Sequence, residues 1–206
     1  MPAYVSMTFE YSRLELDYDN MKELIAYIKH AQLEFKGGVG EYENESLEEI
    51  MEYNQKKLEA NFVLGSGEDK KNDYKQMRFG FEGFSEIRGY ISNNYPADRE
   101  YSFTLLFPEE EVIAERGVFK TEAVAKMKNI SSLLWILPKT RTVQTELETG
   151  EGILTEQEIK DGAAPSVCPL AIVSEKQFGH MEHSAYTDDH IYAGGVLLMP
   201  KDIKLV

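Results

Sequence analysis

Alternation of apolar and polar side chains predicts strands along much of the chain. From Tyr74 onward, Met77, Phe79 and Phe81 alternate with polar or small residues, which is the period expected of a hairpin or meander with one buried face. The same reasoning predicts strands at 3–11, 101–107, 140–147, 170–173 and 191–199. The last of these contains Gly194-Gly195, which indicates a bulge or a close backbone approach.

A spacing of three to four residues between apolar positions predicts helices elsewhere. Two capping boxes, Asn20 with Glu23 and Ser46 with Glu49, mark the starts of helices that we expect to end near Gly37-Gly38 and Asn61, respectively. A third helix, apolar on nearly all sides in its last turns, is expected between Gly117 and Pro138, and a short one after Thr155. The glycines at 37–38 are interpreted as a helix terminator rather than a phosphate loop.

These elements occur in blocks of strands and blocks of helices rather than in strict alternation, which predicts an α+β fold. We expect a mainly antiparallel β-sheet packed by three to four helices, formed by one domain over residues 1–206. The polar stretch Gly65–Asp73 is too short for a domain linker and is interpreted as a loop.

Charge narrows the classes of partner. The chain has 36 acidic and 22 basic residues and a formal net charge of −14. Residues 1–60 carry 13 acidic and 6 basic residues, and 141–206 carry 11 and 5, whereas the middle of the chain is almost balanced. A field of this sign disfavours nucleic acid and anionic membranes and favours encounter with a basic protein.

Sequence features also bear on the compartment. The start of the chain lacks a basic region followed by an apolar one, and the uncharged runs 162–174 and 190–200 are shorter than a membrane span requires. The single cysteine, Cys168, has no partner for an intramolecular disulfide and lies in an apolar context typical of a small buried side chain. We therefore expect a cytoplasmic protein in which Cys168 is not a nucleophile.

A histidine-rich stretch supports one enzymatic hypothesis. Residues 179–190 contain His180, His183 and His190, which could bind zinc or another divalent transition metal, with Glu182 or Asp188 as a fourth ligand or general base. The spacing matches neither the His-Glu-x-x-His motif nor its inverted form. A polar loop with solvent-facing histidines is the alternative interpretation, and a metal-dependent hydrolase is the function that a metal site would imply.

An acidic segment supports a binding hypothesis. Residues 41–53 contain six carboxylates and two tyrosines. Tyrosine provides a large contact area at interfaces, and carboxylates steer and pair Arg or Lys on a partner. The predicted partner-binding residues are Glu41, Tyr42, Glu43, Glu45, Glu48, Glu49, Glu52 and Tyr53. The alternative is a solvated helix N-terminus, where acidic residues stabilise the helix without any partner.

The sequence favours a non-enzymatic, acidic cytoplasmic binding protein, without a cofactor, that recognises and neutralises a basic protein as an inhibitor or immunity-type partner does. The metal-dependent hydrolase is the second hypothesis. Oligomeric state is left open, because the strand expected at 191–199 is either a core strand or an edge that pairs with a second copy.

Overall fold

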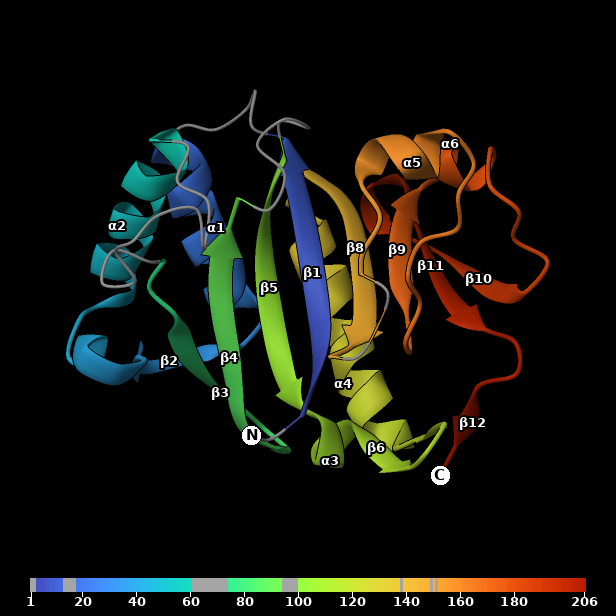
Figure 1. Ribbon diagram of the computed structural model, residues 1–206, viewed down its shortest axis with the longest axis horizontal. Helices are drawn as coiled ribbons and strands as arrows, with labels where there is room; N and C mark the ends of the chain where they lie inside the picture. Colours follow the sequence, from blue (N-terminus) through green and yellow to red (C-terminus); the bar gives the residue numbers. More distant parts are fainter. Residues whose placement is uncertain are drawn as a thin grey trace.

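A nine-stranded antiparallel sheet forms the centre of the molecule. The computed structural model describes residues 3–12, 18–60, 74–93, 100–137, 139–148, 150 and 152–206. The strand order is β10-β11-β9-β8-β1-β5-β4-β3-β2 (Figure 1), and every neighbouring pair is antiparallel. The strands are β1 (Tyr4–Ser12), β2 (Glu34–Gly38), β3 (Met77–Phe81), β4 (Phe84–Ser92), β5 (Glu100–Pro108), β8 (Thr140–Leu147), β9 (Ala171–Ser174), β10 (Tyr186–Ile191) and β11 (Gly195–Pro200).

A second, small sheet joins the C-terminal end of the chain to the middle of the sequence. It has the order β12-β7-β6, with β6 (Ile113–Glu115), β7 (Val118–Phe119) and β12 (Lys204–Leu205). Strand β12 is parallel to β7, and the amide of Thr121 donates to the carbonyl of Val206 at 2.9 Å. The prediction of an α+β fold with a mainly antiparallel sheet is confirmed.

The described residues form six α-helices, more than the three to four predicted. They are α1 (Tyr18–His30), α2 (Leu47–Glu59), α3 (Glu109–Val112), α4 (Thr121–Trp135), α5 (Glu156–Lys160) and α6 (Glu175–Phe178). Helices α3 and α6 have four residues each, too few to show a helical period in the sequence. The start of α6 nevertheless carries a capping box, Ser174 with Gln177, of the kind that located α2 and α5.

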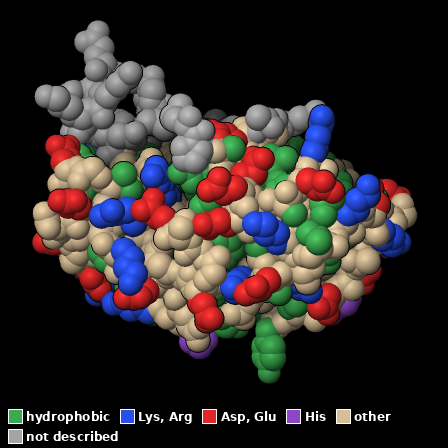
Figure 2. Space-filling view, turned by 90° about the horizontal axis from the view of Figure 1, so that it is seen from below, with side chains coloured by type: hydrophobic (Ala, Val, Ile, Leu, Met, Phe, Trp, Pro, Cys, Tyr) green, Lys and Arg blue, Asp and Glu red, His purple; other side chains and the backbone are tan. Residues whose placement is uncertain are grey.

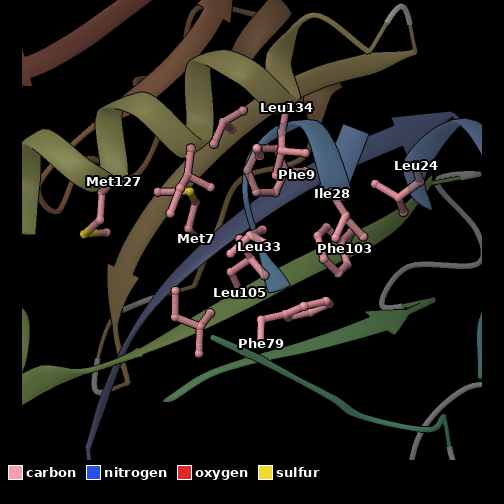
Figure 3. Packing of buried hydrophobic residues seen from close by; sticks show 14 of the residues in the cluster. Met7, Phe9, Leu24, Ile28, Leu33, Phe79, Phe103, Leu105, Met127 and Leu134 are labelled. Atoms are coloured by element: carbon pink, nitrogen blue, oxygen red, sulfur yellow. The ribbon is translucent and has the colours of Figure 1, made fainter. Parts of the chain in front are cut away.

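The main core lies between the sheet and helices α1 and α4, which lie behind it in Figure 1. Odd-numbered side chains of β1 point into this core, and Figure 3 shows Met7 and Phe9 packed with Phe103 and Leu105 of β5. Ile28 of α1 and Leu134 of α4 are fully buried in the same layer. The apolar faces that the sequence predicts for the strands and for the helices therefore pack against each other in this core.

A smaller core lies on the opposite face of the sheet, beneath α5 and α6. It is formed by Ile159, Val173, Met181, Val196 and Leu198. Strands β9 and β11 are thus covered on both faces, because their alternate residues Ile172 and Leu197 belong to the main core. In contrast, strands β1, β5 and β4 are drawn in Figure 1 with no described helix in front of them.

The first predicted helix was too long. Helix α1 ends at His30, and Gln32 adopts a left-handed conformation with φ of 61°. The amides of Leu33 and Gln32 donate to the carbonyls of Ile28 and Lys29 at 3.2 and 3.1 Å, the pattern of a Schellman motif. Phe35 and Gly37-Gly38 therefore belong to β2 rather than to a helix and its terminator.

The expected strand at 191–199 is instead the second half of a hairpin. Strand β10 ends at Ile191, the chain turns through Tyr192–Gly194, and β11 begins at Gly195. Ala193 and Gly194 both have positive φ values, 57° and 66°, which suit a tight turn. At Gly195 a side chain, not another backbone, approaches closely: an added Cβ would lie 2.4 Å from Nε1 of Trp135.

Some sequence features fall outside the description given by the structure. The predicted loop at 65–73 and the turn residues 94–96 lie outside the described residues. Among the described helices, none is both long and apolar enough to cross a membrane.

Candidate functional site

The acidic segment forms a short 3-10 helix, η2 (Gly40–Tyr42), followed by α2. Ser46 caps α2 as predicted. The amide of Ser46 donates to Oε2 of Glu49 at 2.7 Å, and the amide of Glu49 donates to Oγ of Ser46 at 3.2 Å. The Ser46 amide and the Ser46 hydroxyl both donate to the Glu49 carboxylate, and these two hydrogen bonds hold the pKa of Glu49 below its usual value. Glu49 therefore has a structural role at the helix start.

The cap gives a first testable expectation. Replacing Ser46 by Ala removes the side-chain oxygen that accepts from the Glu49 amide, so we expect the free energy of unfolding to fall by about 1 kcal/mol. Urea denaturation followed by circular dichroism measures this change. Ser46→Asp, which keeps an accepting oxygen, is the control expected to retain most of the stability. Equal stability of Ser46→Ala and the unmodified chain would contradict the capping role.

Three other residues of the segment enclose a lysine from the same chain. The ammonium of Lys75 lies 2.6 Å from both carboxylate oxygens of Glu45. It also lies 4.4 and 4.3 Å from the ring centroids of Tyr42 and Tyr53, within range of a cation–π interaction. The side chain of Lys75 is only 11% exposed. Tyr42, Glu45 and Tyr53 are therefore engaged within the molecule.

Asn54 fixes the backbone of this lysine. Its Nδ2 donates to the carbonyl of Lys75 at 2.9 Å, and its Oδ1 accepts from the amide of Lys75 at 2.8 Å. Both residues are buried. This contact could not be predicted from the sequence pattern, because Lys75 follows Glu45 by 30 residues. One signal was present: Asn54 is a polar residue within the apolar face of α2.

The remaining predicted residues face solvent. Glu48 pairs with Lys29 at 2.9 Å and Glu52 with Lys56 at 2.7 Å, with the two carboxylate side chains 59% and 53% exposed. Glu41 and Glu43 are exposed as well, and a hydrogen bond to Glu41 is the main cause that raises the pKa of Tyr42 to about 12. We call Glu41, Glu43, Glu48 and Glu52 the η2–α2 acidic surface.

The three predicted metal ligands are not assembled into a metal site. His183 packs against Phe178, with ring centroids 4.4 Å apart, and His190 lies with Nδ1 3.3 Å from Oε1 of Glu175. His180 is exposed in the turn after α6. Residues 152–206 are all described, and no group of three or more His, Cys, Asp or Glu side chains in the described parts of the chain is placed to hold a metal.

The proposed carboxylate partners of the histidines have other positions. Glu182 accepts a hydrogen bond from the amide of Ser184 at 2.7 Å, and hydrogen bonding to Ser184 is the main cause that lowers its pKa. Asp188 lies exposed on β10, together with His190. Residues 186–190 of the stretch interpreted as a histidine-rich loop therefore belong to an edge strand. Because residues 187–190 are all polar, this strand lacks the alternation of apolar and polar residues by which the other strands were predicted.

Cys168 is half-buried beside the main core, and burial raises the pKa of its thiol. A thiol with a raised pKa is a weak nucleophile at neutral pH. This environment agrees with the prediction of a packing role.

A buried carboxyl group lies on the polar side of the sheet, at Glu10. Its side chain accepts a hydrogen bond from Oγ1 of Thr142 and another, at 3.2 Å, from Nε2 of Gln144. Burial is the main cause that raises the pKa of Glu10 to about 8, with the charge of Glu100 adding to it. In the sequence, Glu10 alternates with the apolar residues of β1 and so belongs to its polar face, but nothing in the sequence indicates that this position is buried.

Gln144 extends this network to the segment that covers β8. Its Nε2 donates to the carbonyl of Leu154 at 2.6 Å, and its Oε1 accepts from the amides of Leu154 and Ser166 at 3.1 and 3.0 Å. The amide side chain therefore ties the residues around α5 to the sheet.

An open hollow of about 380 Å³ lies on the polar face of the sheet, between Tyr4, Tyr90 and Glu146. Thr8 and Thr104 in its wall hydrogen-bond to each other, with 3.1 Å between their hydroxyl oxygens. Burial raises the pKa of Glu146, although the amide of Gly152 donates to this carboxylate at 3.0 Å. The lining of the hollow therefore combines hydroxyl and carboxylate groups with the apolar side chains of Leu106 and Ile153.

The structure is that of an α+β protein with four exposed carboxylates on its η2–α2 acidic surface. No protein-family model matches the chain, and no curated protein matches it. Among solved structures, the chain is similar to Pseudomonas aeruginosa T6SS protein PA0821, with a TM-score of 0.41 and 7% sequence identity. The match covers 96% of this chain and 68% of that chain. A likeness at this level establishes neither a shared family nor a shared function.

Proposed function

We propose that this chain is an acidic, cytoplasmic binding protein that recognises and neutralises a basic protein, as an inhibitor or immunity-type partner does. The observation that carries the proposal is the η2–α2 acidic surface. The capping box of α2 uses Glu49, whereas the four carboxylates of this surface are exposed and take no part in it. Charge at such a surface accelerates association with an oppositely charged partner.

The surface is also held in shape before any partner arrives. Lys75 links Tyr42 and Glu45 to Tyr53 on α2, and Asn54 anchors Lys75 to the helix. A preorganised surface loses less conformational freedom on binding. The ion pairs of Glu48 and Glu52 are exposed, and exposed pairs contribute little, so both carboxylates can exchange their lysines for cations of a partner.

One face of the molecule carries charges of both signs. Figure 2 shows Asp and Glu side chains interspersed with Lys and Arg side chains on the face seen from below Figure 1. On this face the net charge of −14 is accompanied by basic side chains, and the proposal assigns recognition to the η2–α2 acidic surface.

A capture experiment with matched variants tests the proposal. The tagged chain is incubated with a lysate at low ionic strength, eluted by a salt step, and the bound proteins are identified by mass spectrometry. A variant with glutamine at Glu41, Glu43, Glu48 and Glu52 is compared with one carrying glutamine at Glu82, Glu110, Glu115 and Glu122. The second set is also exposed and changes the net charge equally.

We expect the unmodified chain and the second variant to retain one basic protein in near-equal amount, and the first variant to lose it. Equal loss from both variants would show that net charge alone attracts the protein and would refute a specific η2–α2 surface. Recovery of no specific protein at low salt would contradict the function itself.

A further inference from the structure

Strand β10 is an open edge of the nine-stranded sheet. Among the described residues it pairs only with β11, from Tyr186 opposite Pro200 to Ile191 opposite Gly195, without a register shift. The side chains at 187–190 are exposed. The outer side of an edge strand presents backbone N–H and C=O groups that another extended chain can pair with.

The other edge of the sheet, β2, is obstructed. Its register with β3 shifts between Phe35 and Gly37, which breaks the regular ladder. The turn that follows β2 folds back onto it, because an added Cβ at Gly38 would lie 2.4 Å from the carbonyl oxygen of Tyr42. Of the two edges, β10 is thus the regular one.

Side chains on β10 specify the sign of the charge that it attracts. Asp188 and Asp189 are adjacent in sequence, so they project to opposite faces of the sheet. Basic side chains from either face of an added strand would find a carboxylate there. Opposite charges on neighbouring strands stabilise the pairing.

An aromatic residue lies at the end of the same strand. Tyr192, in the turn after β10, is 86% exposed, the highest value among the exposed large hydrophobic residues of the described chain. The next residue, Ala193, adopts a left-handed conformation that is unusual for alanine. Exposed tyrosine is a typical anchor residue of protein interfaces.

A second copy of this chain does not fit the edge. Antiparallel pairing of two β10 strands about a twofold axis places Asp188 opposite Asp189 in the fully overlapped register. A shift of the axis onto either aspartate places that residue opposite its own copy. Like charges directly opposite each other are destabilising, so the edge disfavours self-association.

We propose that β10 binds an extended, basic segment of the partner protein, which adds to the sheet as a tenth strand and contacts Tyr192 at its end. This inference rests on the proposed function, because it assumes a basic protein partner. It assigns main-chain pairing to the β10 edge and leaves charge steering to the η2–α2 acidic surface.

The probe is a short fluorescent peptide of alternating valine and lysine, compared with the same peptide N-methylated at alternate residues. N-methylation removes backbone donors but preserves the charge, so it separates strand pairing from electrostatic attraction. By fluorescence anisotropy, we expect the N-methylated peptide to bind at least about tenfold more weakly. In hydrogen exchange, the amides of 186–191 should gain protection with the unmodified peptide.

Variants locate the site. Asp188→Asn with Asp189→Asn should weaken peptide binding about tenfold, whereas Glu110→Gln with Glu115→Gln, an equal change of charge at exposed positions elsewhere, should leave it within about twofold. Tyr192→Ala should weaken binding without affecting stability, because its side chain is exposed.

Equal binding of the two peptides, or unchanged exchange at 186–191, would overturn the inference, as would a lack of any binding. None of these outcomes decides the proposed function, which depends on capture of a basic protein and its loss from the η2–α2 variant. Failure of that capture would overturn the function independently of the peptide.

Discussion

Replacing Glu10 by glutamine is expected to stabilise the protein at neutral pH, and by more as the pH rises toward 8. Burial raises the pKa of Glu10 from 4.5 to about 8, so the folded chain holds a proton that the unfolded chain releases at lower pH. Between these two pKa values the folded state binds more protons, and the free energy of unfolding falls as the pH rises. Each pH unit within this window costs up to about 1.4 kcal/mol.

Glutamine keeps the size of the side chain and an oxygen that can accept from Thr142 and Gln144, but it does not titrate. The quantity compared is the free energy of unfolding of Glu10→Gln minus that of the unmodified chain. We expect this difference to be about 3 kcal/mol larger at pH 7 than at pH 4.5. Urea denaturation at several pH values measures both curves. Glu110→Gln, at an exposed position, is the control and should follow the unmodified chain. Parallel curves for Glu10→Gln and the unmodified chain would contradict a buried, neutral Glu10.

Replacing Lys75 by methionine is expected to lower the free energy of unfolding by about 2 kcal/mol. The substitution retains the aliphatic stem but leaves the Glu45 carboxylate, which is 31% exposed, without its cation. Breaking a buried pair costs about 3–5 kcal/mol, and the partial exposure of Glu45 places this pair below that range. Urea denaturation measures the loss.

A double-mutant cycle with Glu45→Gln separates the ion pair from other effects of the substitution. We expect Glu45→Gln to recover part of the stability in the Lys75→Met background, because the uncompensated carboxylate is then removed. Lys56→Met, at an exposed ion pair with Glu52, should unfold at the same urea concentration as the unmodified chain. Additive effects at Lys75 and Glu45 would show that the pair contributes nothing to the stability of the acidic segment.

Elements with a strong period could be predicted from the sequence. Strand β1, the β3–β4 hairpin and helix α4 were located because their buried side chains recur at one period over several residues. Strands β2 and β10 were missed, since β2 contains two glycines and β10 is polar on both faces. An edge strand makes few packing contacts, so burial imposes little pattern on its sequence.

The sequence was sufficient to predict which residues form the acidic segment, but not which residues they contact in the fold. The acidic segment and the Ser46 cap are local features, and local signals are sufficient to find them. Tyr42, Glu45 and Tyr53 share one partner, Lys75. This lysine follows α2 in the sequence, and only the tertiary fold brings it next to them. The burial of Glu10 likewise depends on Thr142 and Gln144, more than 130 residues away.

The most direct test of the account is the association rate between the purified chain and the captured basic protein, measured by stopped flow over a series of salt concentrations. We predict a rate that falls steeply with salt, and a rate about tenfold lower at low salt for the variant with glutamine at Glu41, Glu43, Glu48 and Glu52. A rate that is independent of salt and unchanged in that variant would contradict recognition of a basic protein by the η2–α2 acidic surface.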